Sequence, residues 1–456
     1  MTWANKLAFF LICAVVIFTT LAYGTVHQPI IAIFYITVAA ILILWAIDGF
    51  LSGTTRFSAS VLQLPILGAA VYGLIQVVPF GSMAETSGIS GIPRTISLDP
   101  FATQISAVHF FALLIFFAVS LVFIDSAARL RKVVAVIAVF GFAYAFFAIL
   151  QFVLSPDKIY GIYETQFAAP FGSFVNRHNF AAYMEMTLSV PAGLLFVGAV
   201  SKDKKLLYIT AIALMGIALL LSGSRGGLVA FLAEIIFLLM LTTSSKSRGT
   251  LFLKIGLAVV LIGAIIGGSI FVGGETSLTR LAETAASKDV TTDRAHIWNV
   301  TFKVIANNLP FGAGLGAFGV AYTPSDSKSG LERVEQAHND YLQVAADAGI
   351  VGVLIGLSFL FLLFRLGLRA AKVRNTYRRG VAAGALAGCF AIFVHSLFDF
   401  VLHTTAVSIL FLMLVALIVA SRNRYEDDVE EFDGHKVKRR NPSSVASISS
   451  ARRELK

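Results

Sequence analysis

The sequence QAHNDYLQVAADAGIVGVLIGLSFLFLLF, residues 336–364, places a polar cluster directly before a long apolar run. The run is long enough to cross a bilayer, which requires about 20 mostly apolar residues. A histidine, an asparagine and an aspartate are expected beside a membrane only where something polar meets them. We therefore interpret residues 336–341 as the centre of a candidate site and the apolar runs around it as its scaffold.

Composition assigns the chain to the integral membrane proteins. Of its 456 residues, 57% are hydrophobic and 14% are charged, and the mean hydropathy is +0.81. Soluble domains carry about 25% charged residues. The apolar runs have the length of helices, and they lack the alternating pattern of a transmembrane β-barrel. The sequence therefore predicts an all-α polytopic membrane protein.

Charge and cysteine content narrow the class further. The net charge is +10, but lysines and arginines lie mainly in alternate loops, so membrane lipids rather than nucleic acid are the expected partner. Cys13 and Cys389 lie in apolar runs and are interpreted as packing residues. Lys6 precedes the first run and no small-residue cleavage site follows it, which favours a retained span over a signal peptide.

About twelve apolar segments are long enough to be predicted as spans. They cover residues 7–24, 29–47, 61–79, 105–124, 132–154, 179–200, 206–222, 226–243, 251–272, 341–364, 380–400 and 404–421. The distribution of basic residues predicts that both termini are cytoplasmic. This divides the chain into spans 1–9 (1–272), an outer loop (273–340), spans 10–12 (341–421) and a charged, serine-rich tail (422–456) predicted to be disordered.

The outer loop contains its own structural signals. A helix is predicted from Arg294 to about Asn308, with Thr292 and Asp293 as its cap and Pro310 as its stop. The glycines that follow lack the lysine of a nucleotide-binding loop, so they predict a compact turn or a backbone that lies close to a ligand: Gly312, Gly314, Gly316 and Gly319.

Four polar segments lie at the outer ends of spans, namely residues 176–179, 222–227, 293–296 and 338–340. Helix packing could bring them around one outward-facing cavity. Arg177, Arg225 and Arg294 could together hold a diphosphate, because a guanidinium group offers a fork of donors that matches phosphate. The alternative is that these arginines reach lipid head groups.

Two histidines are candidates for chemistry. His338 suits a general base, because an imidazole titrates near neutral pH, and Asp340 or a nearby backbone carbonyl could fix its tautomer. The alternative is a hydrogen-bonded histidine at the membrane surface. His178 is predicted to bind rather than react, because the charge of Arg177 would lower its affinity for protons.

For the polar residues inside spans, a structural role is favoured over a role in chemistry. His395, Asp399 and His403 are four residues apart, but a turn is expected between the last two. Packing is favoured for them over polar support of the site, and a metal site is favoured least. Glu185 and Glu234 lie within spans and are expected to be paired or near the surface.

Several of these segments resemble the O-antigen ligase family. The resemblance is strongest over residues 170–360 and rests on FGSFVNRHN (171–179), SGSRGG (222–227), Asp293 and Arg294 through Trp298, GAGLG (312–316), and AHNDY (337–341) followed by Gly349. The family also contains O-antigen polymerases, exopolysaccharide polymerases and protein O-oligosaccharyltransferases.

The resemblance implies a GT-C-like glycosyltransferase of the bacterial inner membrane. Such an enzyme takes a glycan from undecaprenyl diphosphate on the periplasmic face, with no cofactor and no metal. It implies that Arg177, Arg225 and Arg294 grip the diphosphate and that His338 deprotonates or orients the acceptor hydroxyl. Supporting roles fall to a set of neighbouring residues: His178, Asn179, Asn339 and Asp340.

The predicted function is the transfer of an O-antigen polysaccharide to lipid A–core. The alternative within the same fold is a polymerase, an exopolysaccharide enzyme or an O-oligosaccharyltransferase, with another glycan acceptor. A polysaccharide or lipid transporter is the alternative from another class. It would place ionisable residues at mid-bilayer in broken helices, whereas the polar residues here gather at the outer edge.

Overall fold

The computed structural model describes residues 1–82, 91, 93–165, 168–243, 248–286, 294–328 and 333–422. The predicted cap at Thr292 and Asp293 and nearly all of the predicted tail lie outside these residues. The described chain is mainly helical and follows the order α1 (Trp3–Leu21), α2 (Gln28–Ser52), α3 (Gln63–Gln76), α4 (Pro100–Phe123), α5 (Ala127–Leu154), α6 (Arg177–Val197), α7 (Lys205–Leu221), α8 (Arg225–Thr242), α9 (Arg248–Ala286), α10 (Arg294–Asn308), α11 (Phe318–Tyr322), α12 (Asp340–Ala370), α13 (Thr376–His395) and α14 (Thr405–Ala420).

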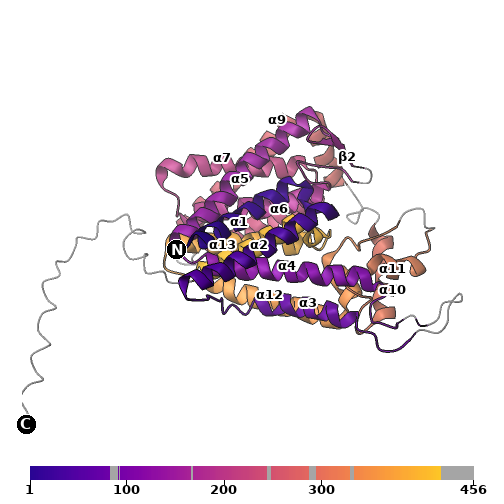
Figure 1. Cartoon of the computed structure of the whole chain (residues 1–456). Helices are drawn as coiled ribbons and strands as arrows, with labels where there is room; N and C mark the ends of the chain where they lie inside the picture. Colours follow the sequence, from indigo (N-terminus) through magenta and orange to yellow (C-terminus); the bar gives the residue numbers. More distant parts are fainter. Residues whose placement is uncertain are drawn as a thin grey trace, which may run out of the picture.

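Short elements connect these helices. The described residues include four 3-10 turns, η1 (Tyr23–Thr25), η2 (Lys202–Lys204), η3 (Thr323–Ser325) and η4 (Val401–His403). Between α5 and α6, β1 (Lys158–Ile159) pairs antiparallel with β2 (Tyr163–Glu164). The helices run side by side, with α10 and α11 together at the end of the bundle away from the N-terminus (Figure 1).

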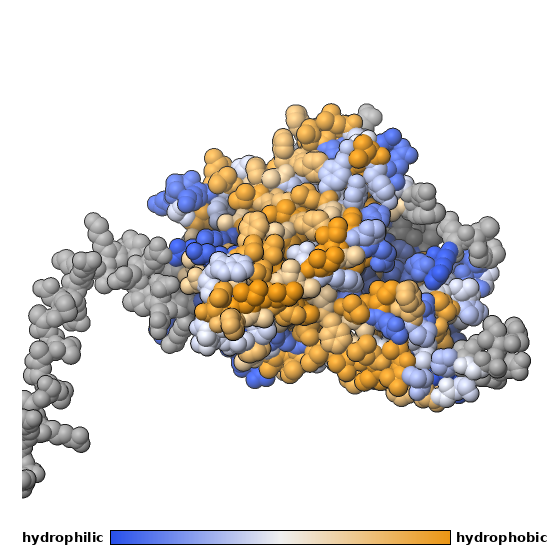
Figure 2. Space-filling view, in the orientation of Figure 1, coloured by the Kyte–Doolittle hydropathy of each residue, from blue (hydrophilic) through white to orange (hydrophobic). Residues whose placement is uncertain are grey.

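Each of the twelve predicted apolar segments overlaps one helix, and the all-α polytopic class is confirmed. Among the described residues, ten helices are long and apolar enough to cross a membrane, while α3, with 14 residues, and α14, with 16, are shorter. Figure 2 shows apolar residues over the helices and hydrophilic residues gathered towards their ends. This distribution suits a bundle surrounded by lipid.

The bundle is centred on α6 and α13, which lie against each other (Figure 1). Their contact is made by glycines: a Cβ atom on Gly193 would lie only 2.4 Å from the carbonyl oxygen of Gly380. Small residues allow helix backbones to approach closely in membranes, where packing rather than hydrophobicity drives association. The two helices run antiparallel, so the start of α6 and the end of α13 lie at the same end of the bundle.

Three helices begin at this end with polar caps, as the sequence favours. Asn176 caps α6 by accepting the amide of His178, at 2.9 Å, and Ser224 caps α8 by accepting the amide of Gly227, at 3.1 Å. Asn339 caps α12 through the amides of its first turn. Such side chains satisfy the donors that a helix start leaves unpaired.

The outer loop is joined firmly to the bundle. The predicted helix from Arg294 to Asn308 is confirmed as α10. The glycines after it form a compact turn against α12, where the amide of Gly314 donates to the carbonyl of Asp347, at 2.9 Å. Helix α12 is kinked at Gly349 (φ 59°, ψ −150°), and the next amide, that of Ile350, donates to the carbonyl of Pro310. Gly312 and Gly314 thus lie in a compact turn, as one of the two interpretations predicts, while Gly319 lies in α11.

Candidate functional site

The site is centred on Asp399, which lies in the turn between α13 and η4 and is 2% exposed. Its Oδ2 atom pairs with the guanidinium of Arg294, at 3.1 Å, and its Oδ1 atom lies 3.3 Å from Nδ1 of His338. Nδ1 of His178 is 3.8 Å from Oδ2. One carboxylate thereby gathers residues from three of the four polar segments that the sequence singles out.

The surroundings of Asp399 keep it ionised. Burial alone would raise the pKa of this carboxyl group. The hydrogen bond from His338 and the positive charge of neighbouring groups, Arg294 among them, outweigh burial and hold the pKa well below its usual range. Nδ1 of His338 therefore acts as the donor to Asp399, which leaves Nε2 of this ring as an acceptor.

The backbone of His338 is held in an unusual conformation. Its φ angle is +49°, in the left-handed region that few residues with side chains adopt. Both backbone groups of the preceding residue, Ala337, are held by side chains. The indole of Trp298 donates to the carbonyl of Ala337, at 3.0 Å, and the amide of Ala337 donates to the side-chain oxygen of Gln343, at 2.7 Å. Strain of this kind persists where the surrounding structure fixes it, and it is frequent at active sites.

Nδ1 of His338 contacts the Asp399 carboxylate rather than Asp340 or a backbone carbonyl, which corrects the sequence-based expectation. The carboxylate of Asp340 accepts from the hydroxyl of Ser396, at 2.7 Å, and lies 3.0 Å from Nδ1 of His403. The reason is local: Asn339 caps the helix, so Asp340 is the first helical residue and faces the turn after α13. The side-chain amide of Asn339 donates to the backbone carbonyl of Leu397, in the same turn. These two residues contact the turn that contains Asp399 and help to hold it.

The spacing of His395, Asp399 and His403 does not place them on one helix face, because α13 ends at His395. Each has a different partner. His395 lies 3.0 Å from Glu185, and His403 contacts Asp340. The preference for packing is therefore wrong for Asp399, whose position matches the less favoured interpretation, polar support of the site.

His178 connects the segment at 176–179 to that at 222–227. Its Nδ1 atom lies 2.8 Å from Oγ of Ser224, the cap of α8. Asn179 is buried in the first turn of α6. The contact makes the beginnings of α6 and α8 neighbours, although 46 residues separate His178 from Ser224.

The three arginines share one structural position, because Arg177, Arg225 and Arg294 are the first residues of α6, α8 and α10. The start of a helix carries a partial positive charge, so a cation there is unfavourable while an anion is favoured. Three arginines at three helix starts therefore suit a strongly anionic ligand.

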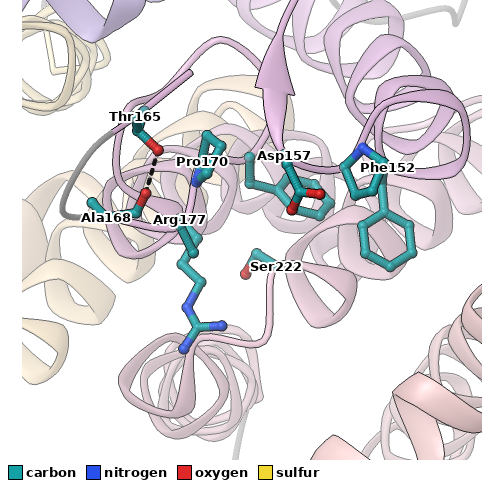
Figure 3. A pocket seen from close by; sticks show the side chains of 10 residues that line it. Phe152, Asp157, Thr165, Ala168, Pro170, Arg177 and Ser222 are labelled. Atoms are coloured by element: carbon teal, nitrogen blue, oxygen red, sulfur yellow. Dashed lines mark hydrogen bonds between the residues drawn. The ribbon is translucent and has the colours of Figure 1, made fainter. Parts of the chain in front are cut away.

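Arg177 also lines a cavity of about 220 Å³. Its side chain extends past Ser222, with Asp157 and Phe152 on the other side of the cavity (Figure 3). The lining does not include Arg225, Arg294 or His338. The contacts described above, rather than this cavity, connect the three helix starts.

Sequence reasoning missed the central role of Asp399. One signal was available: it is the only acidic residue between positions 380 and 421, in a stretch next to the outer end of two spans. A single carboxylate there could have been matched to the basic residues predicted for the same side of the membrane.

Comparison with known families agrees with the motifs. Residues 210–357 match a family model described as O-antigen ligase, a region that includes Arg225, Arg294, His338 and Gly349 but neither Arg177 nor Asp399. No curated protein matches the chain. The resemblance to the O-antigen ligase family is therefore confirmed over residues 210–357, and it supports a ligase- or polymerase-type function.

Proposed function

We propose that this protein, with its O-antigen ligase domain, moves a polysaccharide from undecaprenyl diphosphate to lipid A–core at the periplasmic face of the bacterial inner membrane. The family match supports glycosyl transfer, and the ten candidate membrane spans within the described part of the chain support an integral membrane enzyme. The observation that carries the proposal is the Asp399 cluster, defined as His178, Arg294, His338 and Asp399, beside three helix starts.

In this proposal Arg177, Arg225 and Arg294 bind the donor diphosphate. Arg294 uses one nitrogen for Asp399, and a guanidinium group has five N–H donors, so others remain for phosphate oxygens. Holding the departing diphosphate is the larger part of catalysis, because negative charge develops there as the glycosidic bond breaks. The helix starts add to this stabilisation.

His338 is the proposed base for the acceptor hydroxyl. Asp399 accepts a hydrogen bond from Nδ1–H of the ring, so Nε2 can take the proton of the attacking hydroxyl. The acceptor oxygen then bonds to the anomeric carbon from the side opposite the diphosphate, the bond from that carbon to the phosphate oxygen breaks, and the configuration inverts. The imidazolium that forms is stabilised by the ionised Asp399.

A deletion strain tests the ligase assignment. We expect lipopolysaccharide without O-antigen, together with polysaccharide that accumulates on its lipid carrier. The wild-type gene should restore the capped product. Lipopolysaccharide that instead carries single unpolymerised units would rule out the ligase and favour a polymerase of the same fold.

Purified protein in lipid vesicles tests the chemistry. With carrier-linked polysaccharide and lipid A–core, we expect glycosylated core and free undecaprenyl diphosphate. Arg225→Lys should reduce the rate, because lysine cannot reproduce the forked donor geometry. Arg94→Lys is the matched control, since Arg94 stacks on Phe80 and lies outside the Asp399 cluster. Equal losses in the two variants would count against a specific diphosphate site.

A further inference from the structure

A second polar chain leads from the site into the membrane-spanning part of the bundle. Glu185 on α6 and His395 at the end of α13 are both fully buried, and Nδ1 of His395 lies 3.0 Å from the Glu185 carboxyl group. This confirms the expectation that Glu185 is paired. An ionisable residue inside a membrane protein is costly and is commonly retained for function.

The chain continues from His395 to the site. Nε2 of His395 lies 3.5 Å from Oγ of Ser224, the longest contact in the series, and the same Oγ lies 2.8 Å from Nδ1 of His178. The amide of Gly227 also donates to Ser224. His178 is 22% exposed, so the series ends at a ring that reaches the surface of the site.

Two glycines make room for this series. A Cβ atom on Gly226 would lie 3.1 Å from the His395 ring, and one on Gly227 would lie 3.0 Å from Oε1 of Glu185. Both distances are shorter than ordinary carbon contacts. The glycines of the SGSRGG segment therefore allow α8 to begin directly against Glu185 and His395, which is a reason for their presence that diphosphate binding does not supply.

The protonation state of Glu185 sets the direction of each hydrogen bond in the series. A neutral Glu185 donates to Nδ1 of His395, whose Nε2 then donates to Ser224, whose hydroxyl donates to Nδ1 of His178. The ring of His178 then carries its proton on Nε2. An ionised Glu185 reverses every step and leaves Nε2 of His178 without a proton. The protonation state of Glu185 thus determines whether Nε2 of His178 donates a hydrogen bond to a ligand or accepts one from it.

The surroundings favour the neutral acid. Glu185 is fully buried, and Glu234 on α8 is a second fully buried carboxyl group. Among the described residues, Glu234 has no hydrogen-bond partner. An ionised carboxylate without a cationic partner is costly in an apolar interior. Asp399 does not compete for His178, because 3.8 Å is too long for a hydrogen bond.

We propose that Glu185 is a positioning residue whose neutral carboxyl group, acting through His395 and Ser224, fixes His178 as a hydrogen-bond donor to the anionic leaving group of the donor substrate. The identity of that anion rests on the proposed glycosyl transfer. The tautomer of His178 does not, and it can be measured without any substrate.

The first experiment is spectroscopic. Protein labelled with ¹⁵N at histidine is prepared in lipid, and the His178 signals are identified by their loss in His178→Asn. We expect the spectrum of a ring protonated at Nε2 in the wild type and in Glu185→Gln, whose amide can still donate. Glu185→Met should shift the signals towards a mixture of tautomers. A wild-type ring protonated at Nδ1, or no change in Glu185→Met, would overturn the proposal.

Activity gives the second readout. Glu185→Met should lower the rate constant kcat about 10-fold to 100-fold, the effect of losing a hydrogen bond to a charged group, while Glu185→Gln stays within about threefold of the wild type. Thr187→Val is the matched control, as it removes a buried hydroxyl of the same helix that donates to the carbonyl of Tyr183, outside the series. A Glu185→Gln variant that folds but is as slow as Glu185→Met would show that the ionised acid is required and would overturn the proposal.

Two further outcomes are separable. If Glu185→Met does not fold, Ser224→Ala breaks the same series and leaves the acid in place, and we expect the same shift of the His178 signals. If the wild type transfers no glycan, the proposed function fails, while the ¹⁵N spectra still decide whether Glu185 controls His178.

Discussion

The molecule has two clusters of charged residues that teach different lessons. The Asp48 cluster, defined as Asp48, Arg56, Asp125 and Arg129, joins the end of α2 to the junction of α4 and α5. Arg56 pairs with both aspartates, at 3.1 and 2.6 Å, and Arg129 pairs with Asp125, at 3.4 Å. Two cations meet two carboxylates, so the charges balance within the cluster.

The Asp399 cluster is built differently. One carboxylate faces an arginine and two imidazoles, and Arg177 and Arg225 begin the neighbouring helices α6 and α8. The starts of α6 and α8 add positive potential beside it, which favours an anion there. The comparison indicates that a charge-balanced cluster holds helices together, while a cluster that lies at helix starts suits an anionic ligand.

The largest effect that this comparison predicts is on catalysis. His338→Gln removes the proposed base and should lower the transfer rate about 100-fold to 10,000-fold, the range for general-base groups. The thermal unfolding midpoint should change little, because His338 is partly exposed. Rates and midpoints are measured on the same purified protein in lipid vesicles.

Asp399→Asn provides the companion to this test. It keeps the shape of the side chain but removes the charge that orients His338 and pairs with Arg294. We expect a loss of rate in the same direction. A variant at either position that transfers glycan at the normal rate would remove the distinction between the two clusters.

A smaller effect, on stability, is expected at the other cluster. Asp48→Asn leaves Arg56 with one carboxylate instead of two and should cost about 1–2 kcal/mol, less than a fully buried pair because Arg56 is 40% exposed. The thermal unfolding midpoint should fall. The rate per folded molecule should stay within about twofold, because distant sites act independently.

The exposed Asp203 in η2 provides a matched control for this change. Asp203→Asn should leave the midpoint where it is. If Asp48→Asn slowed transfer as strongly as His338→Gln without unfolding the protein, the Asp48 cluster would have a functional role that its charge balance does not suggest.

The smallest effect concerns pH. Burial opposes the charge of His403, but its hydrogen bond to Asp340 and the charge of that carboxylate raise its pKa above the ordinary value. A raised pKa in the folded state stabilises the fold below the unfolded value of about 6.5, and this is lost as the pH rises through the folded value. The unfolding midpoint should therefore decline across that interval. His403→Asn should decline less, and an equal decline would exclude His403 as the cause.

Helices and their starting points could be predicted from the sequence. Runs of apolar residues identify the helices of the bundle, because a bilayer demands length and hydrophobicity. Asn176, Ser224 and Asn339 mark helix starts through their capping side chains. Arg294 and Pro310 delimit α10 for equally local reasons. These features depend on neighbours in the chain, so composition and spacing are enough.

The partners inside the site could not be predicted in this way. His338 meets Asp399 across 61 residues, and Glu185 meets His395 across 210. The face of a helix that packs against its neighbours is normally recognised because it is apolar while the other side of the helix is polar. Helices that are apolar all round give no such signal. The rotation of α6 against α13 is set instead by contacts such as that between Gly193 and Gly380, which sequence periodicity does not reveal.

The kink at Gly349 has a mechanical consequence. A Cβ atom there would lie 2.2 Å from the carbonyl oxygen of Pro310, so even a methyl group would force the segment after α10 away from α12. That segment anchors the far end of the helix whose first residue is Arg294. Helix α10, 15 residues long, connects this segment to Arg294. The position of the Arg294 guanidinium relative to the Asp399 carboxylate therefore depends on Gly349, a residue that has no side chain.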